Sequence, residues 1–565
     1  MWGGFLWIEG FPFLWRRLSW RGGLPPLGCE ATLNPLTAIP QSERVSRFAT
    51  ASQPNGGKPP RHKKACTTGK LPHYKESHKP LIFSAAHSFF SDSKGPCACT
   101  GAANLTEMAM TKTRSKKALY LGLPLALAIS AGAGWLAWDY WFKDNPGYPV
   151  KVMKQATELQ ERILSFDSHI TVPLSFGAHG NEADKDGSGQ FDLIKANRGR
   201  LSGAALTVFG WPEMWNGPNA PHRPTDGFVE EARNQQEVRY KIISGLVRDF
   251  PNQVGIAYTP DDFRRLHGEG KFAIFISMLN AYPLGNDLSK LDLWAARGMR
   301  MFGFSYIGNN SWADSSRPLP FFNDSPDALD GLSEIGKQAV QRLNDLGVII
   351  DVSQMSTKGL EQVAQLSRTP MVASHSAPRA AVDIPRNLSD KELQLIKNSG
   401  GVVQVVGFSQ YLKPLTQNTQ DKLNALRARF DLPPLPNLAM ALMPGDPIIT
   451  AWSEQKLGQY ASGLYAILEE EPKATLKDLG DAIDYTVRKV GIDHVGIASD
   501  FNDGGGIKGW ENVGEVRNVT AELIQRGYSE ADIAKLWGGN FLRVWEQVQK
   551  AAKPTLISRQ EPVKP

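Results

Sequence analysis

TPMVASHSAPRAAVDIPRN, residues 369–387, holds the pattern that decides the fold. It opens with the apolar run Met371 to Ala373, which is long enough for one buried strand, and Pro378 stops this strand because proline has no N–H to donate. His375 lies between them, at the carboxyl end of the expected strand, where α/β barrels and open α/β sheets place their chemistry. A lone histidine there is more often a structural residue, so the interpretation depends on how the other strands end.

Short apolar runs alternate with amphipathic helical segments from about residue 160 onward. Eight such units predict a parallel sheet closed into a (β/α)8 barrel of the TIM type. We expect Gly210–Gly227 to form a loop over the barrel mouth, residues 410–470 to be an insertion, and Thr520–Arg526 and Glu530–Lys550 to close the barrel. The expected strands are Ile163–Phe166, Ala204–Phe209, Phe272–Met278, Arg300–Phe304, Val348–Val352, Pro370–Ala373, Val402–Val406 and Val495–Ala498.

The net charge of +6 is unevenly distributed along the 565 residues. Residues 1–109 contribute +7 and residues 111–138 contribute +4, which leaves −5 for the remainder, so nothing indicates a nucleic-acid partner. All four cysteines also lie in the first 109 residues. The body of the chain therefore has no thiolate nucleophile and no thiolate metal ligand, and the C-A-C pair at 97–99 lacks the second pair that a zinc site needs.

The amino-terminal part is organised like an export signal. Residues 1–109 show no sustained periodicity and are expected to be disordered, or to be upstream sequence translated from an early start. The basic segment TKTRSKK and the apolar run 118–138 follow, so residues 110–139 predict a signal peptide or a signal anchor. The positive flank predicts export of the body into the periplasm, anchored in the inner membrane through 118–138. Residues 140–159 are then a linker, 160–552 the barrel and 553–565 a flexible tail.

Polar residues follow most of the expected strands. In a barrel the carboxyl ends of parallel strands face one pocket, so we expect these side chains to gather there. Their shared placement favours a functional role over a structural one. The residues are Asp167 and His169; Asn280 and Tyr282; Tyr306, Asn309, Asn310 and Asp314; Gln354 and Ser356; His375, Arg379 and Arg386; and Asp500, Asn502 and Asp503.

Four separate segments resemble the membrane (renal) dipeptidases over roughly residues 160–550. These segments are GVIIDVSQMS, PMVASHSAPRAAVDIPRN, HVGIASDFNDGG and NVTAELIQRGYSEADIAKLWGGNFLRVWEQV, and they agree in order. The family consists of zinc enzymes with an amidohydrolase-like barrel. The resemblance implies a two-zinc site in which a carboxylate bridges the metals and a bridging hydroxide attacks a dipeptide bond.

Only part of the family's ligand set is kept at the matching positions. The family's H-x-D on the first strand matches DSHIT, which supplies His169 but has Thr171 at the carboxylate position. The bridging Glu of the third strand falls at Leu279, and the fifth-strand His falls at Gln354. The resemblance therefore implies the metal ligands His169, His375 and Asp500.

This reduced set limits what the site can hold. Two Zn²⁺ ions need anionic ligands and a bridge, whereas leucine cannot bridge and neutral threonine and glutamine are poor zinc ligands. Two histidines and one aspartate are the minimum for one catalytic zinc. In the family, however, the positions of His169 and His375 serve different metals, so we expect them to lie too far apart to share one. A site without metal is the favoured interpretation, and one weakly bound zinc ion is the alternative.

The expected pocket is basic on one side and aromatic on the other. The resemblance implies that Arg386 grips the carboxylate of a peptide, and Tyr306 replaces a family histidine that assists the tetrahedral intermediate. Tyr306 is thus expected to be a proton donor or a hydrogen-bonded wall. The candidate catalytic residues are Tyr306, His375 and Asp500, and the candidate substrate-binding residues are Arg386, Arg379, Asn310, Trp312 and Tyr282, with Trp211 as a further wall.

The lost ligands and the export signal together resemble a narrower subgroup, the dipeptidase-related proteins of periplasmic pyoverdine maturation. That resemblance implies a protein required when a peptide siderophore precursor is oxidised, with a periplasmic oxidase as partner and a homodimer as a further expectation. Two alternatives stay open. One is a zinc-dependent dipeptidase with an altered ligand set, and the other is a non-catalytic peptide-binding scaffold.

Overall fold

The computed structural model describes residues 145–178, 180–211, 226–318, 324–434 and 452–553. The expected signal segment, most of the Gly210–Gly227 loop and nearly all of the expected tail lie outside these ranges. None of the helices within them is both long enough and apolar enough to cross a bilayer.

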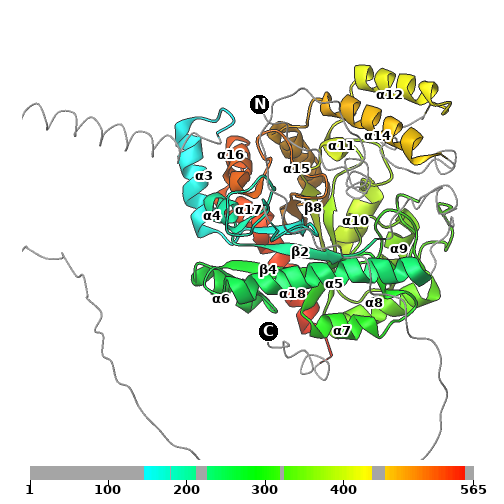
Figure 1. Ribbon diagram of the computed structural model, residues 1–565. Helices are drawn as coiled ribbons and strands as arrows, with labels where there is room; N and C mark the ends of the chain where they lie inside the picture. The colour runs from blue at the N-terminus through cyan, green and yellow to red at the C-terminus, as the bar shows by residue number, and fades with distance from the viewer. Residues whose placement is uncertain (1–144, 179, 212–225, 319–323, 435–451, 554–565) are drawn as a thin grey trace, which may run out of the picture. The chain divides into compact units, whose positions relative to one another are not determined.

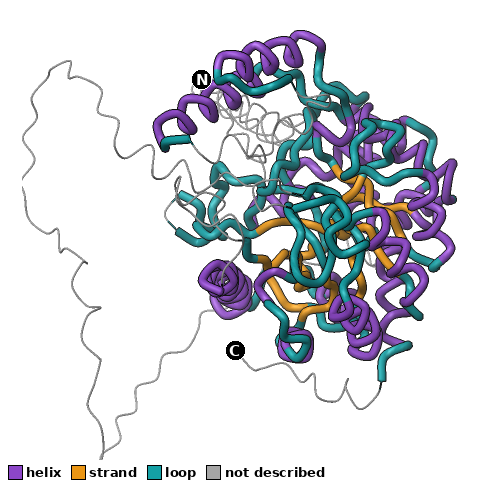
Figure 2. Tube along the Cα trace, turned by 90° about the vertical axis from the view of Figure 1, so that its right-hand side faces the viewer, coloured by secondary structure: helices purple, strands orange, loops and turns teal. Residues whose placement is uncertain are grey.

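A parallel sheet lies at the centre of the described residues (Figure 2). Its strands follow the order β1-β2-β4-β5-β6-β7-β8-β9, and a bridge between Ile170 and Phe501 joins the first strand to the segment after the last, which leaves a nearly closed barrel. The strands are β1 Phe166–Thr171, β2 Gly203–Phe209, β3 Val254–Ile256, β4 Phe272–Leu279, β5 Met299–Gly303, β6 Ile349–Asp351, β7 Met371–Ser376, β8 Val402–Val406 and β9 Val495–Ala498.

The first strand begins later in the sequence than predicted, and one short strand was not predicted. The predicted strand was Ile163–Phe166, but Ile163 caps the preceding helix and β1 runs from Phe166 to Thr171. The error arose because β1 is a polar strand, FDSHIT, that is nonetheless entirely buried. The missed strand, β3, has only three residues and pairs with β4 alone, so its apolar run is shorter than the pattern that identifies a strand. The other expected strands match the observed ones within one residue at each end, except that β7 continues to Ser376 and so includes His375.

Helices connect the strands and begin at side-chain caps. Ser356, Ser389 and Thr475, for example, each accept a hydrogen bond from a backbone N–H of the first turn. The helices, several labelled in Figure 1, are α3 Val150–Arg162, α4 Leu193–Gly199, α5 Asp226–Asp249, α6 Pro260–Gly268, α7 Lys290–Ala296, α8 Glu334–Leu346, α9 Thr357–Leu366, α10 Asp390–Asn398, α11 Ser409–Leu412, α12 Gln417–Arg429, α14 Glu454–Glu469, α15 Leu476–Val490, α16 Val516–Gln525, α17 Glu530–Ala534 and α18 Asn540–Lys550.

The expected insertion contains α11, α12 and α14. Helices α12 and α14 lie side by side (upper right in Figure 1) and share an apolar cluster that includes Leu423, Leu426, Tyr460 and Leu464. This cluster is separate from the main core, so the insertion packs largely against itself.

Aromatic side chains fill the amino-terminal end of the barrel. The ring of Phe541 on α18 stacks on Phe166 with centroids 4.3 Å apart, and Trp545 meets Phe275 edge to face at 4.8 Å. All four side chains are fully buried, and burying each contributes roughly 1.5–3 kcal/mol. The packed end is therefore the stable base of the barrel, and the polar groups lie toward the carboxyl ends of the strands.

Candidate functional site

His169, His375 and Asp500 meet inside the barrel. The two imidazole rings stack with centroids 3.8 Å apart and planes 17° apart, and His169 Nε2 lies 3.7 Å from Asp500 Oδ1. One ligand atom from each residue falls within 4.8 Å of the other two, and all three residues are buried. The expectation that the histidines lie too far apart was wrong, because β1 and β7 meet across the barrel, where Ser168 Oγ donates to Ser374 O at 2.6 Å.

The backbone at this site is held in a left-handed conformation. Asp500 has a φ of 60° and Gln354 a φ of 69°, which non-glycine residues rarely adopt. Asp500 N donates to His169 O at 3.1 Å, and its own carbonyl accepts a bond from Gly505 N at 2.9 Å. Unusual conformations of this kind persist where the surrounding structure fixes them, and they concentrate at functional sites.

A hydrogen-bonded chain passes through His375. Arg317 Nη2 donates to Gln354 Oε1, and Gln354 Nε2 lies 2.9 Å from His375 Nε2. On the other side of the ring, His375 Nδ1 lies 2.7 Å from Ser374 Oγ, which donates to Asp351 Oδ2 at 2.6 Å. The chain thus runs from a buried cation to a buried carboxylate.

Burial keeps both histidines uncharged. Loss of solvation, together with nearby Arg386, lowers the pKa of His169 to about 3, and it lowers the pKa of His375 well below its usual value, with help from His169, Arg386 and Arg317. Both imidazoles are therefore neutral at physiological pH. A neutral imidazole is the form that accepts hydrogen bonds and binds metals.

Burial also raises the pKa of two aspartates, Asp351 and Asp167. It raises the pKa of Asp351 despite the hydrogen bonds from Ser374 that oppose the shift. It raises the pKa of Asp167 to about 6, and this carboxylate accepts backbone bonds from Ser499 N and His169 N through Oδ1. The two acids fix the backbone of β1, β7 and the segment after β9, and so position both histidines.

A two-zinc centre does not fit these residues. Leu279 is buried and offers no ligand atom, Thr171 supplies a neutral hydroxyl in place of a carboxylate, and Gln354 donates its amide N–H toward His375. Asp500 is then the one carboxylate in the buried donor group, whereas paired divalent ions need several anionic ligands and a bridge. The remaining group, His169, His375 and Asp500, could bind one metal ion.

Arg386 and Arg379, which were expected to bind the substrate, form hydrogen bonds within the protein. Arg386 donates from Nη1 to Ser376 Oγ at 3.0 Å and from Nη2 to His375 O at 2.6 Å, and only 3% of its surface is exposed. Its guanidinium therefore braces the backbone of β7 next to the histidines. Arg379 donates to Asn387 O and lies 3.8 Å from the Glu392 carboxylate, which caps α10. Arg379 thus stabilises the loop after β7.

Three other candidates for substrate binding, Trp312, Asn310 and Tyr282, lie buried or partly buried within the loops that follow β4 and β5. Trp312 was expected to form a pocket wall, but its side chain is fully buried and its Nε1 donates to Gly285 O. Asn310 bridges the loops after β4 and β5, because its amide donates to Asn280 Oδ1 and Phe304 O. Tyr282 is 8% exposed, and its hydroxyl has no hydrogen-bond partner among the described residues.

Tyr306 lies in an aromatic setting near a carboxylate. Its hydroxyl is 3.3 Å from Asp503 Oδ2, and its ring contacts Phe209 and Trp211. Arg317, which the sequence analysis did not single out, stands over the same ring at 5.8 Å. A lone arginine in a loop carries no sequence signal of this placement. Arg317 therefore joins Tyr306 to the Gln354–His375 pair.

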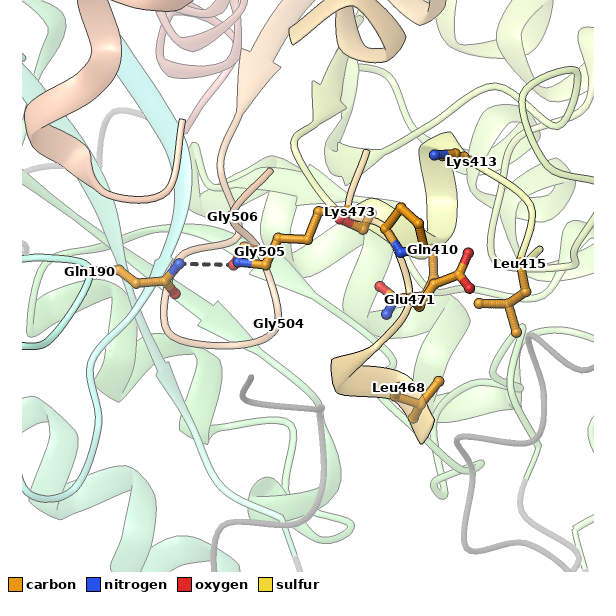
Figure 3. Close-up of a pocket in the computed structure, with 12 residues that line it drawn as sticks. Gln190, Gln410, Lys413, Leu415, Leu468, Glu471, Lys473, Gly504, Gly505 and Gly506 are labelled. Carbon is orange, nitrogen blue, oxygen red and sulfur yellow. Dashed lines mark hydrogen bonds between the residues drawn. The ribbon is translucent and has the colours of Figure 1, made fainter. Parts of the chain in front are cut away.

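A small cavity lies beside the site (Figure 3). It encloses about 50 Å³ between the loops that follow β1, β8 and β9, and Lys413 and Lys473 are among its lining residues. Gln190 Nε2 donates to Gly505 O at 2.9 Å across its wall, and Gly505 N is bonded to Asp500 O. The volume suits a few water molecules rather than a peptide.

Comparison with known proteins identifies one family and several related proteins. The family model for membrane dipeptidase (peptidase family M19) matches residues 153–559. Dipeptidase tcpJ of Claviceps purpurea (strain 20.1) is 24% identical over 370 residues, which cover 65% of this chain and 71% of the relative. The crystal structure of the probable dipeptidase PvdM from Pseudomonas aeruginosa is 78% identical with a TM-score of 0.69, and the match covers 72% of this chain and 100% of that one.

A metallopeptidase from Rhodobacter sphaeroides, liganded with a phosphinate mimic of the dipeptide L-Ala-D-Ala, is 22% identical with a TM-score of 0.52. That match covers 68% of this chain and 99% of the other, and it shows the shared fold alone. The family match extends over most of the chain and includes every strand of the barrel. The chain belongs to the membrane dipeptidase family, peptidase family M19.

Proposed function

We propose that this protein binds a peptide at the carboxyl end of the barrel without carrying out two-zinc hydrolysis. The single observation that carries this proposal is the Gln354–His375 hydrogen bond, which replaces a pair of metal-binding histidines by an amide and an imidazole. Leu279 supports it, because an apolar side chain stands where the family has its bridging carboxylate.

The peptide is a siderophore precursor of the pyoverdine type, and the protein serves its maturation at the oxidation step. Support comes from the high identity to the P. aeruginosa probable dipeptidase PvdM and from the altered ligand set of the barrel. We further propose that the protein acts in the periplasm, anchored in the inner membrane through residues 118–138, and that it works beside a periplasmic oxidase. We also propose that the protein forms a homodimer, because members of this family often form dimers.

The remaining polar groups suit recognition of a peptide. His169 Nε2 and Thr171 Oγ1 are buried and have no hydrogen-bond partner among the described residues. Buried polar atoms are normally satisfied by protein, water or ligand, so these two atoms offer an acceptor and a hydroxyl to a peptide N–H or C=O. In this proposal the chain's residues orient the peptide, and the bond-making chemistry belongs to the partner oxidase.

A deletion strain tests this function. Loss of the gene leaves the siderophore precursor unoxidised in the periplasm, as measured by mass spectrometry, and the wild-type gene restores the mature pigment. His169→Ala fails to restore it, whereas His267→Ala, a change of a half-buried histidine on α6, restores it fully. Normal pigment in the deletion strain would contradict the proposal. Full rescue by His169→Ala would show that the interior of the barrel is not needed for maturation.

A zinc-dependent dipeptidase is the second candidate. The observation that favours it is the buried group His169, His375 and Asp500, which offers the three protein ligands that a single catalytic zinc requires. A bound zinc would supply Lewis acidity and an activated water molecule. Stoichiometric zinc, together with hydrolysis of a dipeptide panel that is lost on chelation, establishes this candidate. If substitutions in the barrel leave maturation untouched and no hydrolysis is found, the remaining candidate is a purely structural scaffold.

A further inference from the structure

We propose that Gln354, fixed by Arg317, occupies the metal-facing nitrogen of His375 and so lowers the affinity of the buried histidine and aspartate group for divalent metal. Gln354 and Arg317 are positioning residues in this proposal, since both act through His375. The inference concerns metal affinity alone, and it holds whether or not the protein takes part in siderophore maturation.

The orientation of the Gln354 amide follows from its neighbour. A guanidinium has only N–H donors, so the amide atom that Arg317 Nη2 contacts must be the oxygen. The amide nitrogen consequently faces His375, with Gln354 Nε2 at 2.9 Å from His375 Nε2. The opposite amide orientation would place N–H against N–H at Arg317, which is unfavourable in a buried site.

The tautomer of His375 follows from this orientation. Because Gln354 donates, His375 Nε2 must accept, and the ring proton therefore resides on Nδ1. Ser374 Oγ donates its proton to Asp351, so its lone pairs accept the Nδ1–H at 2.7 Å. Both nitrogens of His375 are satisfied by protein partners, and a metal can reach Nε2 only after the amide of Gln354 has left.

Several contacts make this displacement costly. Arg317 is itself held by the hydroxyl of Tyr411, 3.1 Å from Nη1, and by the ring of Tyr306. Gln354 is 2% exposed, so moving its amide away leaves a buried oxygen, a buried imidazole or both to find new partners. The nearby positive charge of Arg317 also disfavours a divalent cation at His375.

Isothermal titration calorimetry with zinc, on the wild type and three variants, tests the proposal. Gln354→Ala frees Nε2, and Gln354→His adds a fourth donor. Both variants are expected to bind zinc about 10- to 100-fold more tightly than the wild type, the range that hydrogen bonds to metal ligands control. The matched control is Gln404→Leu, which removes another buried glutamine of the barrel wall. Zinc affinity that is unchanged in both Gln354 variants, or raised equally by the control, overturns the proposal.

A measurement on the unmodified chain covers the case in which the variants do not fold. The ¹⁵N chemical shifts of His375, assigned by their loss in His375→Asn, report which ring nitrogen is protonated. The expected spectrum is that of an Nδ1–H tautomer with a hydrogen-bonded Nε2, unaltered by one equivalent of zinc. A protonated Nε2, or a shift of Nε2 that follows one equivalent of zinc, overturns the proposal.

Discussion

Ser374→Ala should destabilise the protein far more than the loss of one hydroxyl usually does. Ser374 Oγ both donates to Asp351 Oδ2 and accepts from His375 Nδ1, and the side chains of all three residues are buried. The substitution therefore leaves two buried polar groups without a partner. At about 1–3 kcal/mol for each unsatisfied group, the free energy of unfolding should fall by about 2–6 kcal/mol at pH 7.5.

The loss should also depend on pH, in a direction that the structure fixes. Burial raises the folded-state pKa of Asp351, and the hydrogen bonds from Ser374 oppose this rise. A carboxyl whose folded pKa is raised contributes stability at low pH that is lost as pH rises through that pKa. Removing the Ser374 hydroxyl raises the pKa further, so the variant should lose more stability at pH 7.5 than at pH 5.

Urea unfolding at the two pH values measures both effects. Ser168→Ala is the matched control, because Ser168 is equally buried and donates one hydrogen bond, to Ser374 O. It should cost about 1 kcal/mol at either pH. The hydrogen-bond arrangement around His375 is refuted if Ser374→Ala lowers the free energy of unfolding no more than the control does. It is also refuted if this loss is the same at pH 5 and pH 7.5.

Three further changes test other parts of the structure. In the wild type, stability should fall between about pH 4 and pH 6 as Asp167 ionises, because burial raises its pKa to about 6, and Asp167→Asn should abolish this fall. Thermal unfolding across this range measures the effect, and a pH profile identical to that of the wild type contradicts it. Phe541→Ala should lower the free energy of unfolding by about 3–5 kcal/mol in urea, since its ring is buried against Phe166; a loss below 1 kcal/mol contradicts the packing. Leu279→Glu should lower the melting temperature by burying a charge, and added zinc should recover part of the loss; recovery equal to that of the wild type contradicts a place for residue 279 beside the metal donors.

Most of the fold was predictable because its strands carry local signals. Strands such as Val495–Ala498 are apolar runs that are buried on both faces, and the sequence alone identifies them as strands. Strand β1 was misplaced for the opposite reason: its polar residues are buried through Asp167 and Ser168, whose partners lie on distant segments. Hydrogen bonds of that range leave no pattern in the local sequence.

The sequence identified most residues of the candidate site, but it did not indicate which residues contact one another. His169, His375 and Asp500 were expected at one pocket because each follows or ends a strand, but the two histidines were expected to lie too far apart to share a metal. The structure brings one ligand atom of each residue within 4.8 Å of the others. The role of Arg317 could not be foreseen, since it depends on a loop that returns to Gln354. Trp312 is buried and donates to Gly285 O, and the sequence could not indicate this, because an aromatic residue in a loop at the barrel mouth can face the pocket or lie beneath the loop.

Zinc-edge anomalous diffraction from crystals grown with excess zinc tests the central claim most directly. The claim is that Leu279 and Gln354 have removed the paired metal site while the histidines and Asp500 remain. The account predicts no pair of anomalous peaks about 3.5–4 Å apart at these residues, with at most one weakly occupied position. Two fully occupied peaks joined by a carboxylate would contradict it.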